Sequence, residues 1–185
     1  MPPRRHARLE LDFVRLAGSW RQRQIIQERL PTVLPYLLQR TSILPPNLYC
    51  ITVALTDNTH QQELNRQFRG QNRPTNVLSF PQYSKRQLKQ LSLQAEPVFL
   101  GDISLAYQYV AAEARQDGKA LTNHIIHLVI HGILHILGHD HQAAKPAALM
   151  EQLERDILAR MNIPDPYAQE PAAQPRIAFR NPRNV

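Results

Sequence analysis

The residues best suited to chemistry are histidines gathered in one short stretch. Six of the eight histidines lie between positions 124 and 141. On a helix with about 100° between successive residues, four of them share an arc of about 80°, namely His124, His127, His131 and His135. The other residues of this stretch are almost all apolar, so we expect a buried helix. Buried imidazoles are costly unless their nitrogens have partners.

A metal ion is the partner that the spacing favours. His131 and His135 are one turn apart, so both rings can reach one ion. Gly138 can end the helix in the left-handed conformation and so bring His141 back toward them. Three imidazoles leave the fourth zinc position open, as a catalytic site requires. We therefore predict one zinc ion per chain, bound by His131, His135 and His141.

The neighbouring residues receive lesser roles. His139 is expected to point away from the ligands, whereas His124 and His127 are expected to line a groove or support the ligands. Asp140 either orients a ligand ring or serves as a turn residue. The single cysteine, Cys50, excludes an intrachain disulfide and a four-cysteine zinc site.

The spacing H-x-x-x-H-x-x-G-x-x-H equals that of the metzincin peptidases, in which a glutamate directly follows the first histidine as the general base. Here that position is Gly132. No side chain at Gly132 can accept a proton from a water on the zinc, so a peptidase would lack its central catalytic group.

The charge of the chain indicates a nucleic-acid partner. The net charge is +7, and most of the 22 basic residues are arginines, which bind phosphate through a planar fork. Between Leu64 and Ala95 there is no acidic residue but six basic ones, which are Arg66, Arg69, Arg73, Lys85, Arg86 and Lys89. A solvated basic face is the alternative, but phosphate binding explains this segment better beside a zinc site. Phe68, Phe80 and Tyr83 are candidates for stacking on bases.

The elements that position these residues indicate an α+β fold, in which a small mixed sheet of about four strands packs against helices. One of these helices is the buried zinc-binding helix with its metzincin-like turn. Alternation and β-forming residues predict strands at 9–13, 48–55, 77–80 and 98–105. Helical spacing predicts helices at 21–40 (interrupted at Pro31), 57–68, 107–117, 122–137 and from 146 on, with a polar loop at 82–97.

The length of 185 residues suits a single domain, which we place at residues 1–167. Prolines recur from Pro164 onward, so residues 168–185 are expected to form a mobile basic tail. Acidic residues interrupt the N-terminal segment, and the most apolar stretch, 125–137, is too short to span a bilayer. We expect a cytoplasmic protein with no membrane partner.

Three blocks of the sequence resemble the bacterial YbeY-type endoribonucleases, the rRNA maturation factors. The histidine string from His131 to His141 closely resembles the signature of that family. The segments Glu63–Pro81 and Leu100–Ser104 resemble two further characteristic blocks, and they occur in the family's order. The likeness covers about residues 9–167.

The resemblance implies a single-strand-specific, metal-dependent endoribonuclease. Such an enzyme would act in maturation of the 3′ end of 16S rRNA and in ribosome quality control. Its partners would be single-stranded RNA, an rRNA precursor and the ribosome or its small subunit. The family's zinc ligands match His131, His135 and His141, and its functional arginine matches Arg69. One departure is the run Gln142–Lys145, where acidic residues often follow the third histidine.

The mechanism that we expect is metal-assisted cleavage of a phosphodiester. Arg69 would neutralise charge that develops on the phosphorus centre, and Arg66 and Arg73 would bind the substrate. The general base is not identified, although His127 is a candidate. Two alternatives stay open: a metallopeptidase with a metzincin-like site, and a non-enzymatic zinc-containing ribosome assembly factor. The lack of a fourth protein ligand argues against the latter.

Overall fold

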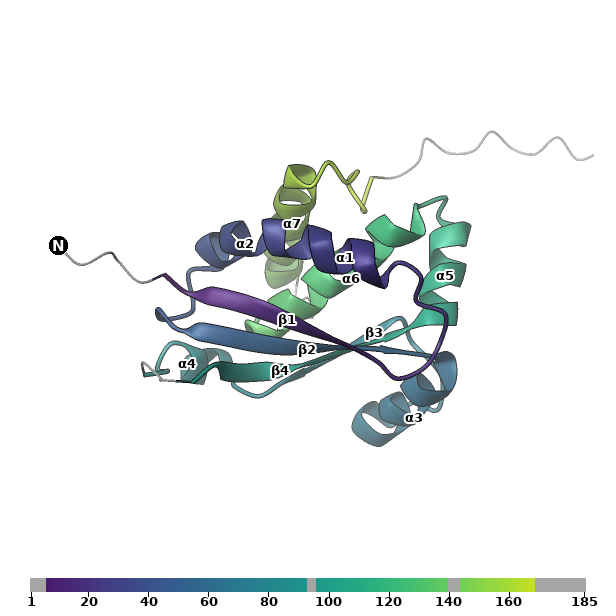
Figure 1. Ribbon diagram of the computed structural model, residues 1–185, viewed down its shortest axis with the longest axis horizontal. Helices are drawn as coiled ribbons and strands as arrows, with labels where there is room; N and C mark the ends of the chain where they lie inside the picture. Colours follow the sequence, from purple (N-terminus) through teal and green to yellow (C-terminus); the bar gives the residue numbers. More distant parts are fainter. Residues whose placement is uncertain (1–5, 93–95, 140–143, 169–185) are drawn as a thin grey trace, which may run out of the picture.

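The computed structural model describes residues 6–92, 96–139 and 144–168 of the chain. Strands and helices pack into a mixed α+β structure with one four-stranded sheet (Figure 1). The predicted fold class is confirmed at this level. Most of the predicted tail, 169–185, lies outside the described residues.

The sheet has the strand order β1-β2-β4-β3. Strands β1 (Arg8–Arg15), β2 (Leu48–Thr56) and β4 (Val98–Ala106) are parallel, and β3 (Val77–Pro81) pairs antiparallel to β4 at the edge. Side chains alternate across the sheet, so Val53 of β2 and its neighbour Ile103 of β4 both lie in the core.

Eight helical segments surround this sheet in the described residues. They are α1 (Arg23–Arg29), the 3-10 turn η1 (Leu30–Thr32), α2 (Leu34–Thr41), α3 (Asn58–Arg69), α4 (Lys85–Leu88), α5 (Tyr107–Gln116), α6 (Leu121–Ile136) and α7 (Ala144–Arg160). The predicted interruption at Pro31 is confirmed, because η1 separates α1 from α2. The prediction of a loop over 82–97 is wrong in part: Ser84 and Gln87 form a capping box that begins α4, and Leu88 is buried.

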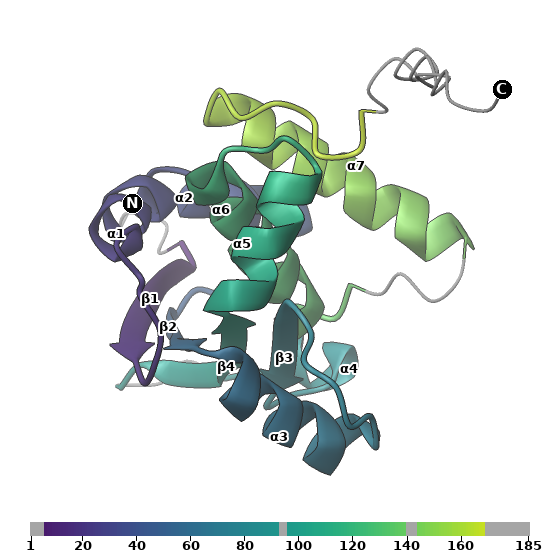
Figure 2. The same cartoon turned by 90° about the vertical axis from the view of Figure 1, so that its right-hand side faces the viewer.

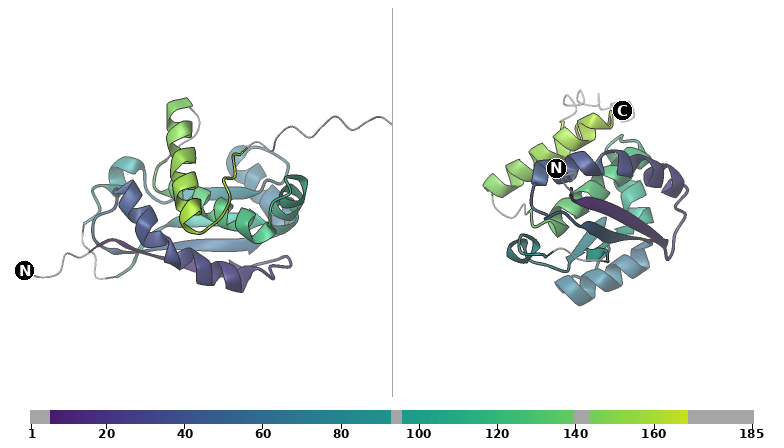
Figure 3. Two further views of the ribbon diagram at one scale, coloured as in Figure 1. Left: turned by 90° about the horizontal axis from the view of Figure 1, so that it is seen from above. Right: turned by 60° about the vertical axis from the view of Figure 1, so that its left-hand side comes forward.

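The helices lie on both faces of the sheet. Helices α1, α2, α6 and α7 lie on one face, and α3 lies on the other (Figures 1 and 2). Buried hydrogen bonds between Gln61 and Ser104 fix α3 against β4. Helix α7 crosses over this helical layer (Figure 3). The next segment, 161–168, returns to the N-terminal half of α6.

Helix α6 packs closely on the sheet, as expected of a helix that is apolar nearly all round. Gly132 faces Ile103 of β4, and a Cβ atom at position 132 would lie 2.9 Å from the Ile103 Cδ1 atom. The position after the first predicted zinc ligand therefore faces the core and leaves no room for a glutamate. In the described part of the chain, we find no helix with the length and apolar character needed to cross a membrane.

The glycine in β4 gives the first testable prediction. Gly101 has a φ of +142°, and an added Cβ would lie 2.2 Å from the Phe80 carbonyl oxygen. It sits where the β2–β4 register shifts between Cys50 and Ile51. We expect Gly101→Ala to lower the free energy of unfolding by about 3 kcal/mol, measured by urea denaturation.

Gly70→Ala is the matched control. Gly70 also has a positive φ, +68°, but no atom lies within 4 Å of the added Cβ. Only the left-handed backbone is penalised there, at about 1 kcal/mol. Equal losses for the two variants would contradict the close approach of the β4 backbone to β3.

Candidate active site

The histidines predicted to share one face of a helix line one side of α6. A cavity of about 220 Å³, which we call the histidine groove, runs along this side between α6, β3 and α5. It is lined by Asn76, Val77, Glu113, Asp117, His124, His127, Leu128, His131 and Tyr167. His131 also lines a second cavity of about 230 Å³, which lies against α7. The groove therefore joins α6 to parts of the chain that precede and follow it.

His131 and His135 come together as predicted. Their Nε2 atoms are 3.1 Å apart, and their ring centroids are 4.6 Å apart in an edge-on arrangement. Both side chains are half-buried. Two imidazole nitrogens that converge in this way can share a proton or bind one metal ion.

A buried carboxylate contacts one member of the His131–His135 pair. Glu154 of α7 is fully buried. Its Oε1 accepts a hydrogen bond from Nδ1 of His131 and its Oε2 accepts one from Nε2 of His127, both at 2.8 Å. The hydroxyl of Tyr167 donates a third bond to Oε2. Three donors around one carboxylate explain how a charge can be stable there.

Burial and hydrogen bonding act in opposite directions on Glu154. Burial acts to raise the pKa of the Glu154 carboxyl, but the hydrogen bonds and the charges of His127 and His131 outweigh it and lower the pKa to about 2. For Tyr167, burial and the nearby Glu154 both raise the pKa of the hydroxyl. Glu154 is therefore ionised and Tyr167 is protonated at neutral pH.

This ionisation fixes the form of the His131 ring. A carboxylate can only accept, so Nδ1 of His131 carries a proton, and in the neutral ring Nε2 then presents its lone pair toward His135. A carboxylate that holds a histidine in this tautomer is the usual support of a metal-binding imidazole. The donor chemistry of His131 and His135 thus fits a zinc ion.

The third predicted ligand, His141, lies outside the described residues, as does Asp140. Within the described ranges, no three His, Cys, Asp or Glu side chains are arranged to hold a metal ion. His139 directly follows Gly138, whose φ of +79° ends the helix. Burial lowers the pKa of the His139 ring, and the nearby Lys85 lowers it further.

A second histidine–carboxylate pair lies at the other end of the groove. Nε2 of His124 donates to Oε2 of Glu113 at 3.1 Å, and the Asn76 amide donates to both oxygens of Glu113. Burial lowers the pKa of His124, although Glu113 opposes this effect. His124 and His127 therefore line the groove and support its carboxylates, as expected.

The predicted RNA-binding arginines lie on another part of the molecule. Arg66, Arg69 and Arg73 are exposed. They stand at the end of α3 and in the following loop, whereas the histidines lie on α6 beyond the sheet (Figure 2). Phe68 and Phe80 pack edge-on at 4.9 Å in a separate cavity under α3, away from the histidine groove.

Two connections join these regions. The Asn65 side chain donates to the backbone oxygen of Arg73, which fixes the loop after α3, and Asn76 at the end of that loop reaches Glu113 in the groove. At the other end of α6, the Lys85 side chain packs so closely on Gly138 that a Cβ there would lie 2.7 Å from the Lys85 Cβ. One basic residue of the predicted segment thus adjoins the histidine helix.

Sequence reasoning missed Glu154, Glu113 and Tyr167. For Glu154 a signal existed: it occupies the apolar stripe of α7, between Met150 and Ile157, where a carboxylate would be buried. A charged residue at such a position needs a partner from another element. For Tyr167 we find no comparable signal.

The fold and the site define an α+β protein with a histidine–carboxylate groove on a buried helix. The fold resembles the solution structure of a Thermotoga maritima protein, with a TM-score of 0.51 at 22% identity, covering 88% of this chain and 99% of that one.

The family model described as Endoribonuclease YbeY matches residues 19–162. The chain therefore belongs to the YbeY endoribonuclease family, and the prediction of an enzyme of this class is confirmed.

Relatives with this name are similar over much of the chain. The protein from Chelativorans sp. (strain BNC1) is 37% identical over 158 residues, which cover 85% of this chain and 93% of the relative. That from Paramagnetospirillum magneticum is 42% identical over 127 residues, covering 69% and 76%. A Rhodopseudomonas palustris protein is 48% identical over 118 residues, covering 64% and 60%. All three are named Endoribonuclease YbeY.

The buried carboxylate gives the second prediction. In Glu154→Gln the amide would turn an N–H toward a donor, so either a hydrogen bond is lost or the histidine that faces the amide must give up its present tautomer. We expect a loss of about 3 kcal/mol or more in the free energy of unfolding, as when one partner of a buried pair is removed, measured by chemical denaturation.

Glu151→Gln on the same helix is the control. Glu151 forms an exposed pair with Arg155 at 3.3 Å, so its loss should cost less than about 1 kcal/mol. If Glu154→Gln lowered the free energy of unfolding no more than this control does, the Glu154 carboxylate would not be the group that orients His127 and His131.

Proposed function

We propose that this chain is a zinc-dependent endoribonuclease that cuts single-stranded RNA. We further propose that it acts in the cytoplasm in 3′ end maturation of 16S rRNA and in ribosome quality control, with the ribosome or its small subunit as partner. Family membership supports the reaction class. The supporting structural observation is the His131–His135 pair, 3.1 Å apart and backed by Glu154.

The proposed zinc ion would be held by His131, His135 and His141. In the neutral His131 ring, the tautomer that Glu154 selects has its proton on Nδ1 and leaves a nitrogen lone pair available at Nε2, which is what zinc requires of an imidazole. When bound, zinc supplies Lewis-acid polarisation of a phosphoryl oxygen and activation of water near neutral pH.

The chain's own residues would bind and orient the RNA. Lys85 beside Gly138 can attract a phosphate to the end of α6. Arg66 and Arg73 would hold further phosphates, and Arg69 would neutralise the developing charge. Because these arginines lie in the last turn of α3 and in the loop that follows it, the RNA strand would leave the groove past Asn76 and continue round the β3 edge toward them.

The two alternatives find less support. A metallopeptidase would need a base beside His131, but Gly132 packs against Ile103 and has no room for one. A non-enzymatic assembly factor would hold its zinc in a closed site, whereas His131, one of the two described ligand candidates, borders two cavities.

The decisive experiment measures cleavage of a labelled single-stranded RNA by the purified full chain, with and without chelator, beside His131→Ala. We expect cleavage that chelator and His131→Ala both abolish and that added zinc restores. Cleavage by the variant at the wild-type rate would refute the zinc site. Degradation of casein instead of RNA would favour the peptidase.

The third prediction concerns zinc content. His131→Ala, His135→Ala and His141→Ala should each lose most of the one zinc ion per chain, whereas His139→Ala should retain it, as measured by elemental analysis. Since zinc would bind only the folded chain, chelator should also lower the melting temperature. Full zinc retention in His141→Ala would contradict the three-histidine set.

The fourth prediction separates catalysis from binding at Arg69. Arg69→Ala should lower the single-turnover rate at saturating RNA by about 10²–10³, as loss of a transition-state donor does, with zinc still bound. Arg69→Lys tests the planar fork.

Arg86→Ala is the control, because Arg86 is an exposed arginine of the same basic segment. It should weaken affinity and reduce the salt dependence without changing the saturated rate. A wild-type saturated rate for Arg69→Ala would make Arg69 a binding contact only.

A further inference from the structure

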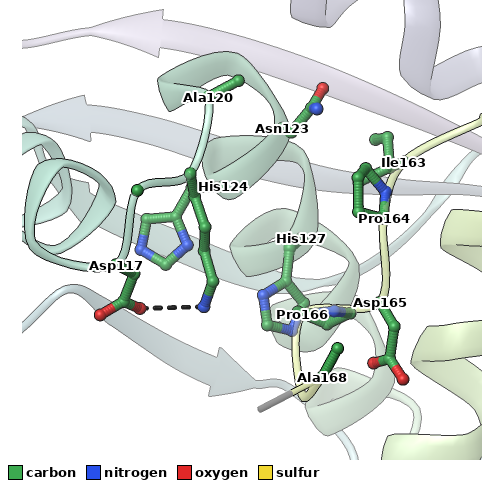
Figure 4. A pocket seen from close by; sticks show the side chains of 12 residues that line it. Asp117, Ala120, Asn123, His124, His127, Ile163, Pro164, Asp165, Pro166 and Ala168 are labelled. Carbon is green, nitrogen blue, oxygen red and sulfur yellow. Dashed lines mark hydrogen bonds and ion pairs between the residues drawn. The ribbon is translucent and has the colours of Figure 1, made fainter. Parts of the chain in front are cut away.

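The segment 161–168, which we call the strap, follows α7 and folds back onto the first half of α6. Pro166 and Ala168 line a cavity of about 330 Å³, and His127 lines the same cavity from α6 (Figure 4). Tyr167, which stands between Pro166 and Ala168 in the sequence, instead lines the histidine groove and the cavity against α7. The strap therefore directs the Tyr167 side chain toward the proposed cleavage site.

Contacts from three segments fix the Tyr167 ring. Oδ1 of Asp165 accepts a hydrogen bond from the Tyr167 backbone N–H at 2.9 Å, and Oδ2 accepts one from Nε of Arg155 at 3.2 Å. The Arg155 guanidinium also lies over the Tyr167 ring, 5.0 Å from its centroid, in a cation–π contact. The same ring meets His127 edge-on, with centroids 5.7 Å apart. The ring thus has neighbours on α6, on α7 and within the strap.

The hydroxyl of this ring adds a third donor to Glu154. It donates to Oε2, which also accepts from Nε2 of His127, whereas Oε1 accepts from Nδ1 of His131. The two imidazole donors come from α6, and the Tyr167 hydroxyl comes from the strap. A donor from a different segment limits how far the carboxylate can rotate together with the two histidine rings.

The burial of Glu154 makes this third donor hard to replace. Glu154 has no exposed surface, so water cannot take the place of the hydroxyl unless the neighbouring groups move. An acceptor that loses a partner in the interior is costly, and the carboxylate can lower that cost by turning. Any such turn moves the oxygen that accepts from Nδ1 of His131. The position of the His131 ring therefore depends on the Tyr167 hydroxyl.

We propose that Tyr167 is a positioning residue for the endoribonuclease reaction. Its hydroxyl holds the Glu154 carboxylate, and this carboxylate orients the His131 ring, whose Nε2 atom lies 3.1 Å from that of His135. Tyr167 acts on the proposed zinc site through Glu154. This inference rests on the proposed zinc-dependent function and adds to it a residue outside the histidine helix.

The alternative role for Tyr167 is packing alone. Its ring contacts with His127 and Arg155 need no hydroxyl, so Tyr167→Phe keeps them and removes the hydrogen bond to Glu154. Loss of a buried hydrogen bond lowers stability in either case. Zinc affinity separates the two roles, because packing alone would leave it unchanged in Tyr167→Phe.

The test measures the zinc affinity of the full chain by competition with a chromogenic chelator. Groups that support metal ligands typically contribute about 10–100-fold in metal affinity or activity. Since Tyr167 acts through a further residue, we expect the lower end of this range. Tyr167→Phe should bind zinc about tenfold more weakly than the wild type.

Tyr36→Phe is the matched control. Tyr36 is also half-buried and also lies under an arginine, with Arg160 at 3.8 Å from its ring centroid, but it belongs to α2 and does not line the histidine groove. It should leave zinc affinity unchanged. In single-turnover cleavage with saturating zinc, Tyr167→Phe should lower the rate at saturating RNA by about tenfold and leave the affinity for RNA unchanged.

Wild-type zinc affinity and a wild-type saturated rate in Tyr167→Phe would overturn the positioning role and leave the proposed function intact. Weaker zinc binding by Tyr167→Phe in a protein that does not cut RNA would support the positioning role and refute the proposed function instead. An equal loss of zinc affinity in Tyr36→Phe would mark a general loss of folding and overturn the specific role of Tyr167, as would a loss of RNA affinity without a loss of rate.

Discussion

The charge on Glu154 is the constraint on which the rest of the site depends. A carboxylate in the interior is stable only when several donors surround it. His127, His131 and the hydroxyl of Tyr167 are those donors. Meeting this requirement fixes two rings of α6 at once and holds α7 against α6. The same contacts that stabilise the interior therefore set the tautomer and orientation of His131.

Glu113 is a second carboxylate that accepts a hydrogen bond from a histidine of α6, and it is less buried than Glu154. It ties His124 of α6 to Asn76 at the start of β3. Since Asn76 ends the loop that carries Arg73, the polar network extends from the groove toward the basic end of α3. Two carboxylates from different helices thus align one row of histidines with separate parts of the fold.

Much of the fold could be predicted from patterns among residues that are close together in the sequence. Strand alternation in β1 and β2 and the helical break at Pro31 depend on neighbours in sequence, and both were predicted well. The pairing of His131 with His135 follows from one helical turn. Helix α4 was missed because it is only one turn long, and because the capping-box residues Ser84 and Gln87 lie among other polar residues that look like a loop.

What could not be predicted were contacts between distant segments. The bonds from α6 to Glu154 and Tyr167 depend on how α7 crosses the helical layer, which no local pattern specifies. The position of Arg69 relative to the histidines likewise depends on α3 lying on the opposite face of the sheet. The resemblance to a family supplied the residues of the site but not these carboxylate supports.

The order in which the chain is synthesised gives Tyr167 a further significance. Domains begin to fold during synthesis, starting from the N-terminal side. The sheet and α6 are complete well before Glu154 and Tyr167 leave the ribosome. Until then the imidazoles of His127 and His131 have no carboxylate to orient them. A nascent chain can thus have its sheet in place while its histidine groove is still unorganised, and the groove becomes organised only once Glu154 and Tyr167 have emerged.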